Sequence, residues 1–160
     1  MAATAKSTPG LTSPGKLTLH LGVLVQPYRA RNKKVSAITT GDVAEILESK
    51  YELIGTFYRV KEKAIAAAIE HSLGGAMESM LMGAPIRDPW AGGMQHIQEG
   101  FRRFISSMEA EKVGIPGTPT KAALMGVNHR LKHPYRSGNP RRPSFRDTGL
   151  LMNSFRSWIA

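Results

Sequence analysis

The stretch KLTLHLGVLVQPY, residues 16–28, is the one long part of this sequence in which apolar residues recur at every second position. Successive side chains of an extended chain point to opposite faces, so the pattern predicts a half-buried β-strand. Pro27 lacks the backbone donor that a strand needs and should end it. The apolar face of the predicted strand consists of Leu17, Leu19, Leu21, Val23 and Val25.

This strand needs a partner, because a lone strand or a two-stranded ribbon is only marginally stable in water. The run VSAIT, residues 35–39, is a weak candidate for a return strand, and the last few residues of the chain are another. Two sources of a further strand stay open, the C-terminal end and a neighbouring copy of the protein. We expect a mixture of the two, and therefore a sheet completed by oligomerisation, with the apolar face of the strand at a subunit interface.

From Thr39 onward the apolar period changes to about 3.6 residues, which predicts helices. Thr39 stands at a capping position, and acids follow in the first turn. Gly74 and Gly75 lie inside the longest predicted helix, where each glycine costs about 1 kcal/mol relative to alanine, and they indicate a kink or a close helix crossing. The predicted helices span residues 39–51, 59–82 and 91–111, with a short one capped by Thr118 and carrying Pro119 at its first position.

Methionines at helical spacing follow the glycine pair. We expect them to fill the core, and a partner surface is the alternative interpretation. The residues concerned are Met77, Met80, Met82 and Met94.

The segment RPSFRDTGLLMNSF, residues 142–155, predicts a late helix capped by Asp147 and packed through Leu151, Phe155 and Trp158. Residues 132–146 before it are basic and rich in proline, so they should lie extended across a surface. The sequence as a whole predicts an α+β fold. A flexible arm, residues 1–16, precedes a single domain, residues 17–160, in which a small antiparallel sheet packs with several helices.

The net charge of +10 is distributed unevenly along the chain. Residues 1–34 hold six Lys or Arg and no acid, residues 35–111 hold seven basic and eleven acidic residues, and residues 112–160 hold nine basic residues and Asp147. This asymmetry indicates a polyanionic partner, either DNA contacted through its phosphates or an acidic protein surface. The candidate contacts for such a partner are Arg29, Arg31, Lys33, Lys34, Arg130 and Lys132.

The sequence carries no recognisable catalytic motif, and we expect neither an enzyme nor a cofactor. His129 and His133 are four residues apart, as helical metal ligands often are, but no Asp, Glu or Cys accompanies them locally. Cysteine is absent altogether, which excludes disulfides. No signal peptide or membrane-spanning run is evident, so no membrane partner is expected.

An ordered set of segments resembles the small virion proteins of tailed bacteriophages that form the neck and join head to tail. The set is LMGAP, then GIPGTPTKAAL, then a late TG-x-L-x-x-S-[IF] motif, matched here by residues 148–155. The similarity extends from about Leu17 to the end of the chain. Family members often continue with further strand beyond this motif, whereas this sequence stops at Ala160.

The resemblance implies a structural protein of the virion neck, assembled in the host cytoplasm. It implies a ring of six or twelve copies, as a connector or tail-completion component through which genomic DNA passes, with neighbouring neck, portal-adaptor and tail proteins as partners. A tail terminator capping the tube is the alternative within the virion, and a non-specific DNA-binding protein is the alternative of another class. Under this resemblance the expected partner contacts are Arg141, Arg142 and Arg146.

Overall fold

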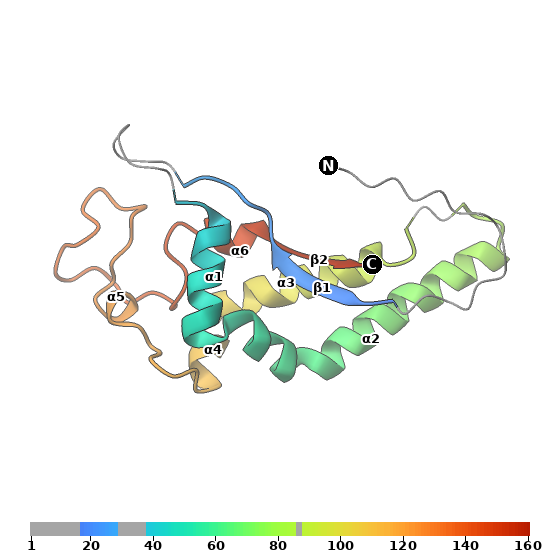
Figure 1. The fold of residues 1–160 in the computed structure, drawn as a ribbon, viewed down its shortest axis with the longest axis horizontal. Coiled ribbons are helices and arrows are strands. Elements are labelled where there is room, and N and C mark those ends of the chain that lie inside the picture. The colour runs from blue at the N-terminus through green and yellow to red at the C-terminus, as the bar shows by residue number, and fades with distance from the viewer. Residues whose placement is uncertain (1–16, 29–37, 86–87) are drawn as a thin grey trace.

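The computed structural model describes residues 17–28, 38–85 and 88–160. Within them the chain is a mixed α+β protein, with six helices and a two-stranded antiparallel sheet packed against helices, as the sequence predicted (Figure 1). The order along the chain is β1 (Leu19–Val23), α1 (Thr40–Tyr51), α2 (Leu53–Leu81), α3 (Ala91–Ser106), α4 (Glu109–Lys112), α5 (Lys121–Leu124), α6 (Leu150–Ser154) and β2 (Phe155–Ile159).

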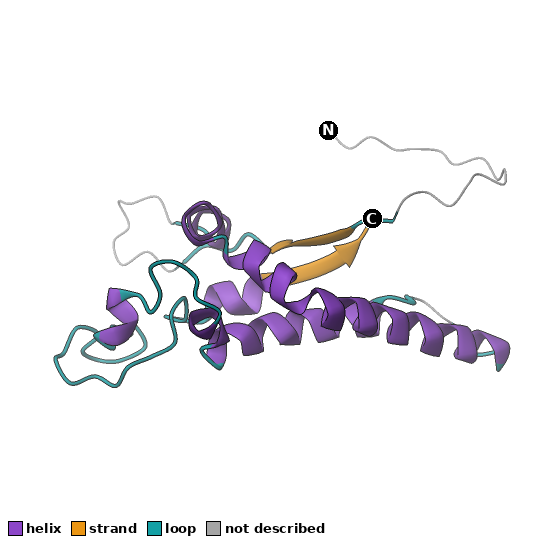
Figure 2. Ribbon diagram, turned by 90° about the horizontal axis from the view of Figure 1, so that it is seen from below, coloured by secondary structure: helices purple, strands orange, loops and turns teal. Residues whose placement is uncertain are grey.

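The predicted strand exists, and its partner in the described residues is the C-terminal end of the same chain. Strand β1 pairs antiparallel with β2, with Leu19 opposite Ile159 and Val23 opposite Phe155. The pairing is shorter than the predicted run, because Leu17 and Val25 lie outside the ladder and are exposed. The sheet lies on one side of the two long helices, α2 and α3 (Figure 2). Most of the predicted return strand lies outside the described residues, and Thr39 makes only an isolated bridge to Pro27.

The start of α1 confirms the predicted cap. The Thr39 side chain accepts the Asp42 backbone amide, and the Asp42 carboxylate accepts the Thr39 amide, which satisfies two otherwise unpaired donors. Helix α2 begins at Leu53 rather than at residue 59, and only Glu52, in a left-handed conformation with φ 46°, separates it from α1. The Glu48 carboxylate accepts the amides of Ile54 and Gly55 at 2.7 and 3.0 Å, and so caps the first turn of α2.

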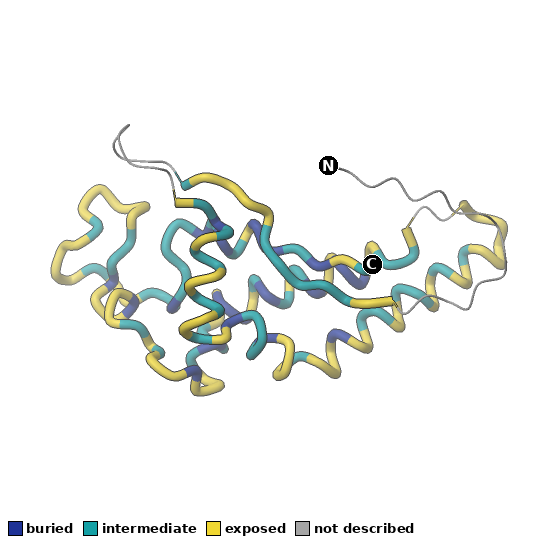
Figure 3. The backbone as a smooth tube through the Cα atoms, in the orientation of Figure 1, coloured by how far each residue is buried: buried dark blue, intermediate teal, exposed yellow. Residues whose placement is uncertain are grey.

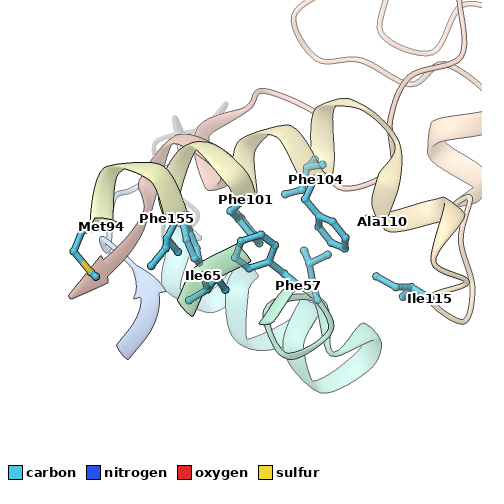
Figure 4. Close-up of a cluster of buried hydrophobic side chains, with 11 residues drawn as sticks. Phe57, Ile65, Met94, Phe101, Phe104, Ala110, Ile115 and Phe155 are labelled. Carbon is cyan, nitrogen blue, oxygen red and sulfur yellow. The ribbon is translucent and has the colours of Figure 1, made fainter. Parts of the chain in front are cut away.

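A cluster of phenylalanines joins α2, α3 and β2 (Figure 4). The Phe101 and Phe155 rings stack with centroids 4.0 Å apart, and Phe57 meets Phe101 edge-on at 5.2 Å. Burial of each ring contributes about 1.5–3 kcal/mol, so the cluster is a large part of the hydrophobic stabilisation. Leu19 and Leu21 of β1 pack against the same cluster.

The close helix crossing lies at Gly93 of α3 and not at the glycine pair of α2. A Cβ on Gly93 would stand 3.1 Å from the Ala68 carbonyl oxygen, whereas a Cβ on Gly74 or Gly75 would meet no atom of the described residues within 4 Å. Helix α2 then runs on past α3 and the sheet (Figure 1). The prediction that its methionines fill the core is therefore wrong for three of them, since Met77, Met80 and Met82 are exposed, and right for Met94.

The segment after α3 is largely irregular. Helix α3 ends at Ser106 instead of residue 111, and α4 is a separate turn after Met108. Helix α5 is capped by Thr120, so the predicted cap at Thr118 is wrong, and the Thr118–Pro119 peptide is cis. From residue 113 to 149 only α5 is regular, and much of the surface there is exposed (Figure 3).

The predicted C-terminal helix is only partly correct. Helix α6 has five residues, Gly149 rather than Asp147 precedes it, and the chain then becomes β2. Strand geometry places Phe155, Ser157 and Ile159 toward the core and turns Trp158 outward, where it is half exposed and stacks on His20 with centroids 5.3 Å apart.

Candidate functional site

The basic segment predicted to lie extended is instead a folded loop held by polar contacts. The Asp147 carboxylate accepts the His129 backbone amide at 2.8 Å and faces the His129 Nδ1 at 2.6 Å. The Asp147 carboxylate accepts from Nδ1 of His129, and the other ring nitrogen, Nε2, lies 2.8 Å from the Tyr135 hydroxyl. Asp147 therefore ties two segments of the loop together, which replaces its predicted role as a helix cap.

Arg142 holds the same region from inside. Its guanidinium donates to the backbone carbonyls of Val127, Pro143 and Arg146, at 3.1 Å and 2.7 Å for the last two. Partial burial lowers the pKa of Arg142 below its usual value, and the nearby Asp147 charge offsets only part of that shift. Arg142 was predicted as a partner contact, but these bonds place it in the structure of its own subunit, and Arg146 beside it is half-buried.

Glu111 fixes the start of the RRPSFR segment. Its side chain is only 6% exposed, accepts the Ser144 amide at 2.8 Å and pairs with Arg141. Burial raises the pKa of Glu111, but the hydrogen bonds from the Ser144 amide and side chain, with the Arg141 hydrogen bond and charge, outweigh it and leave the pKa below its usual value. Arg141 keeps about half of its side chain in solvent, so its predicted partner contact stays a prediction.

We call residues 121–136 the basic loop. It contains four cations and no acid. Lys132 and Arg136 are exposed and line a hollow of about 540 Å³ with His133, Pro134 and Tyr135, while Arg130 is exposed but donates to the Thr148 carbonyl. The loop also exposes large apolar side chains, which are Leu124, Met125, Leu131 and Tyr135.

The opposite end of the molecule presents a different surface (Figure 1). On the outer part of α2, helical spacing brings five residues onto the face turned away from α3. We call this face the α2 strip, and it consists of Glu70, Gly74, Met77, Glu78 and Leu81. Residues 66–82 contain no Lys or Arg, so this end is acidic and apolar. The sequence signal for this surface was the glycine pair, and only the structure could show that no described residue packs against it.

The other residues predicted as contacts are divided between the core, the surface and the part of the chain outside the described ranges. Leu19, Leu21 and Val23 share the sheet face that carries the core residue Phe155, so this part of the predicted interface packs within the subunit. Leu17 and Val25 are exposed, and their place at an interface remains a prediction. The residues outside the described ranges are Arg29, Arg31, Lys33 and Lys34.

Within residues 17–28, 38–85 and 88–160, no three His, Asp or Glu side chains gather as a metal site. The helices of the described chain include none that is long and apolar enough to cross a membrane. Comparison with protein-family models, with curated proteins and with solved structures found no match to this chain.

Proposed function

We propose that this chain is a non-catalytic structural protein of a tailed-phage virion that forms a ring in the neck between head and tail. The observation that carries the proposal is the pair of uncovered surfaces at opposite ends of the molecule, the acidic, apolar α2 strip and the basic loop with its exposed apolar side chains. Two unlike surfaces at opposite ends favour head-to-tail association, which closes into a ring when the rotation between copies permits.

The resemblance of the LMGAP, GIPGTPTKAAL and TG-L-S segments supports the placement of such a ring in the virion neck, as a connector or tail-completion component. Each of the three segments lies at the boundary of a structural element. LMGAP ends the outer part of α2, GIPGTPTKAAL leads into the basic loop, and TG-L-S begins α6. Two of the three thus border the uncovered surfaces.

Electron microscopy and native mass spectrometry of the purified chain without DNA test the proposal. We expect discrete rings, and loss of the gene from a phage that encodes it should leave filled heads beside detached tails. Rings that bind only to isolated tails, with tails of abnormal length in the mutant, would favour the tail terminator instead. A chain that stays monomeric and absent from virions would overturn the proposal.

The basic loop gives one specific reason to keep the DNA-binding alternative. A protein that holds duplex DNA through phosphate contacts loses affinity steeply with salt, by nearly one log unit per contact for each log unit of salt. If the monomeric chain shows such a slope and forms no ring, DNA binding is its function and the neck assignment is wrong.

A further inference from the structure

We infer that the α2 strip of one copy docks on the basic loop of a second copy, and that Gly74 in the strip and Gly75 beside it allow the partner to approach closely. This inference rests on the proposed function in one respect only, namely that copies associate head to tail. It adds which surfaces meet and which residues decide the contact.

The glycine pair is the first observation behind this inference. Glycine inside a helix is unfavourable, and usually a close neighbour explains it. Gly93 has such a neighbour in the α2 backbone, whereas Gly74 and Gly75 have none within the described chain. Two exposed glycines in succession leave the α2 backbone open to close approach by another molecule.

The apolar side chains around the glycines give the same indication. Four large apolar side chains at this end of α2 are between 58% and 87% exposed, namely Met77, Met80, Leu81 and Met82. Methionine is flexible and polarisable, and it suits a surface that must adapt to a partner. Met77 and Leu81 lie in the strip, and Met80 and Met82 flank it, so this end of α2 has the composition of a contact that is covered in the assembled state.

Charge decides which surface covers the strip. Pairing of two α2 strips around Gly74 would bring Glu70 and Glu78 of one copy against the same carboxylates of the other, which is unfavourable. The exposed apolar Ile46 on α1 has Asp42 and Lys50 one turn away on either side and Glu45 and Glu48 beside it, so that surface carries a net negative charge as well. The basic loop combines uncovered apolar side chains with a purely cationic charge, and it therefore complements the strip.

The first test separates folding from assembly. Ala replaces glycine well in an exposed helix, so Gly74→Ala and Gly75→Ala should raise the thermal midpoint of the monomer by roughly 2–4 °C. The same variants should raise the dissociation constant between copies by about tenfold or more, because the added methyl groups hold the partner away. Analytical ultracentrifugation over a range of concentrations measures the dissociation constant. Unchanged association in both variants would overturn the inference.

The second test uses two charge-reversed proteins. Glu70→Lys with Glu78→Lys makes the strip basic, and Lys132→Glu with Arg136→Glu makes the loop acidic. Each doubly substituted protein alone should remain monomeric where the native chain assembles, since like charges meet in both. Mixed in equal amounts, the two should form co-oligomers in which they alternate. Glu62→Lys, on the inner half of α2, is the matched control and should assemble normally.

The outcomes distinguish this inference from the function on which it rests. If the native chain forms rings and both charge-reversed proteins do so alone, the interface is wrong and the ring stands. If the native chain forms no oligomer at any concentration, the ring and the interface are both wrong. Co-assembly of the mixture, together with monomeric separate proteins, supports the interface directly.

Discussion

The basic end of this molecule and the outer end of α2 are held in their conformations by different interactions. The basic end is irregular in backbone, yet Asp147, Arg142 and Glu111 hold it through side-chain hydrogen bonds to distant segments. The outer end of α2 has a regular backbone, and its exposed side chains gain little from the rest of the subunit. The difference teaches that irregular structure can be the better fixed of the two, and that a regular helix can be the part left open for a partner.

The largest effect is expected from a substitution in the phenylalanine cluster, the core on which both ends of the molecule depend. Phe57→Ala deletes a ring from the centre of the phenylalanine cluster and should cost about 3–5 kcal/mol in the free energy of unfolding. Because both ends depend on this core, they should lose structure together, as followed by hydrogen exchange during urea unfolding. The neighbouring Tyr58→Ala, on the exposed face of α2, should change the free energy of unfolding by less than about 0.5 kcal/mol.

A smaller change should break the basic end alone. Gly126 has φ 66°, and a Cβ there would stand 2.5 Å from the Asn139 carbonyl oxygen. Gly126→Ala should therefore destabilise the protein by about 2 kcal/mol or more, measured by chemical denaturation. Gly138→Ala meets a positive φ but no neighbouring atom, so it should cost only about 1 kcal/mol. Equal costs for the two variants would show that the packing around Gly126 is not tight.

The stabilisation that Glu111 gains from its contacts with Ser144 and Arg141 should depend on pH. Glu111→Gln should destabilise the protein by about 1–2 kcal/mol at neutral pH. Because the folded-state pKa of Glu111 is lowered, its stabilisation is complete above the unfolded-state pKa of about 4.3 and is lost as the pH falls through the lower folded value. The difference between native and variant proteins should thus shrink in acid. Exposed Glu99→Gln should show no such trend.

The smallest effect has the opposite sign and belongs to the outer end of α2. Gly75→Ala should stabilise the isolated subunit by about 0.5–1 kcal/mol, because no atom of residues 17–28, 38–85 and 88–160 opposes the added methyl group. Thermal unfolding at a concentration that keeps the chain monomeric measures this gain. A loss of stability instead would mean that the glycine has a role within the subunit, and the contrast between the two ends would weaken.

The fold class, β1, the cap of α1 and the existence of α1, α2 and α3 could be predicted from the sequence because their signals are local. A period of two, a Thr–Asp capping pair and a period of 3.6 each occupy one short window of the chain. The boundary between α1 and α2 could not be predicted, because Glu52 is not a residue that usually adopts a left-handed conformation. The start of β2 was assigned to the late helix, although the last few residues were also a candidate strand, because Ser157 interrupts the apolar alternation on the inner face of β2.

The candidate site was harder to predict than the fold. Asp147 stands before T-G-L, where a helix cap is a reasonable interpretation, yet its partner His129 lies 18 positions earlier. Arg142 was treated as a surface cation, although backbone carbonyls of a folded loop surround it. Such contacts depend on how distant segments meet. The exposed methionines illustrate the same limit, because their helical spacing does not say that α3 begins only beside Ser72 and leaves the rest of α2 uncovered by α3.

The pairing of β1 with β2 sets an order of events during synthesis. Strand β1 is among the first described residues to leave the ribosome, and its partner is made after every other described element. Until then Phe101 lacks the ring of Phe155 on which it stacks, so the aromatic cluster is incomplete. The sheet and the aromatic cluster can therefore form completely only after translation has passed Ile159. Until then the apolar faces of the nascent helices are incompletely covered and must avoid association with other chains.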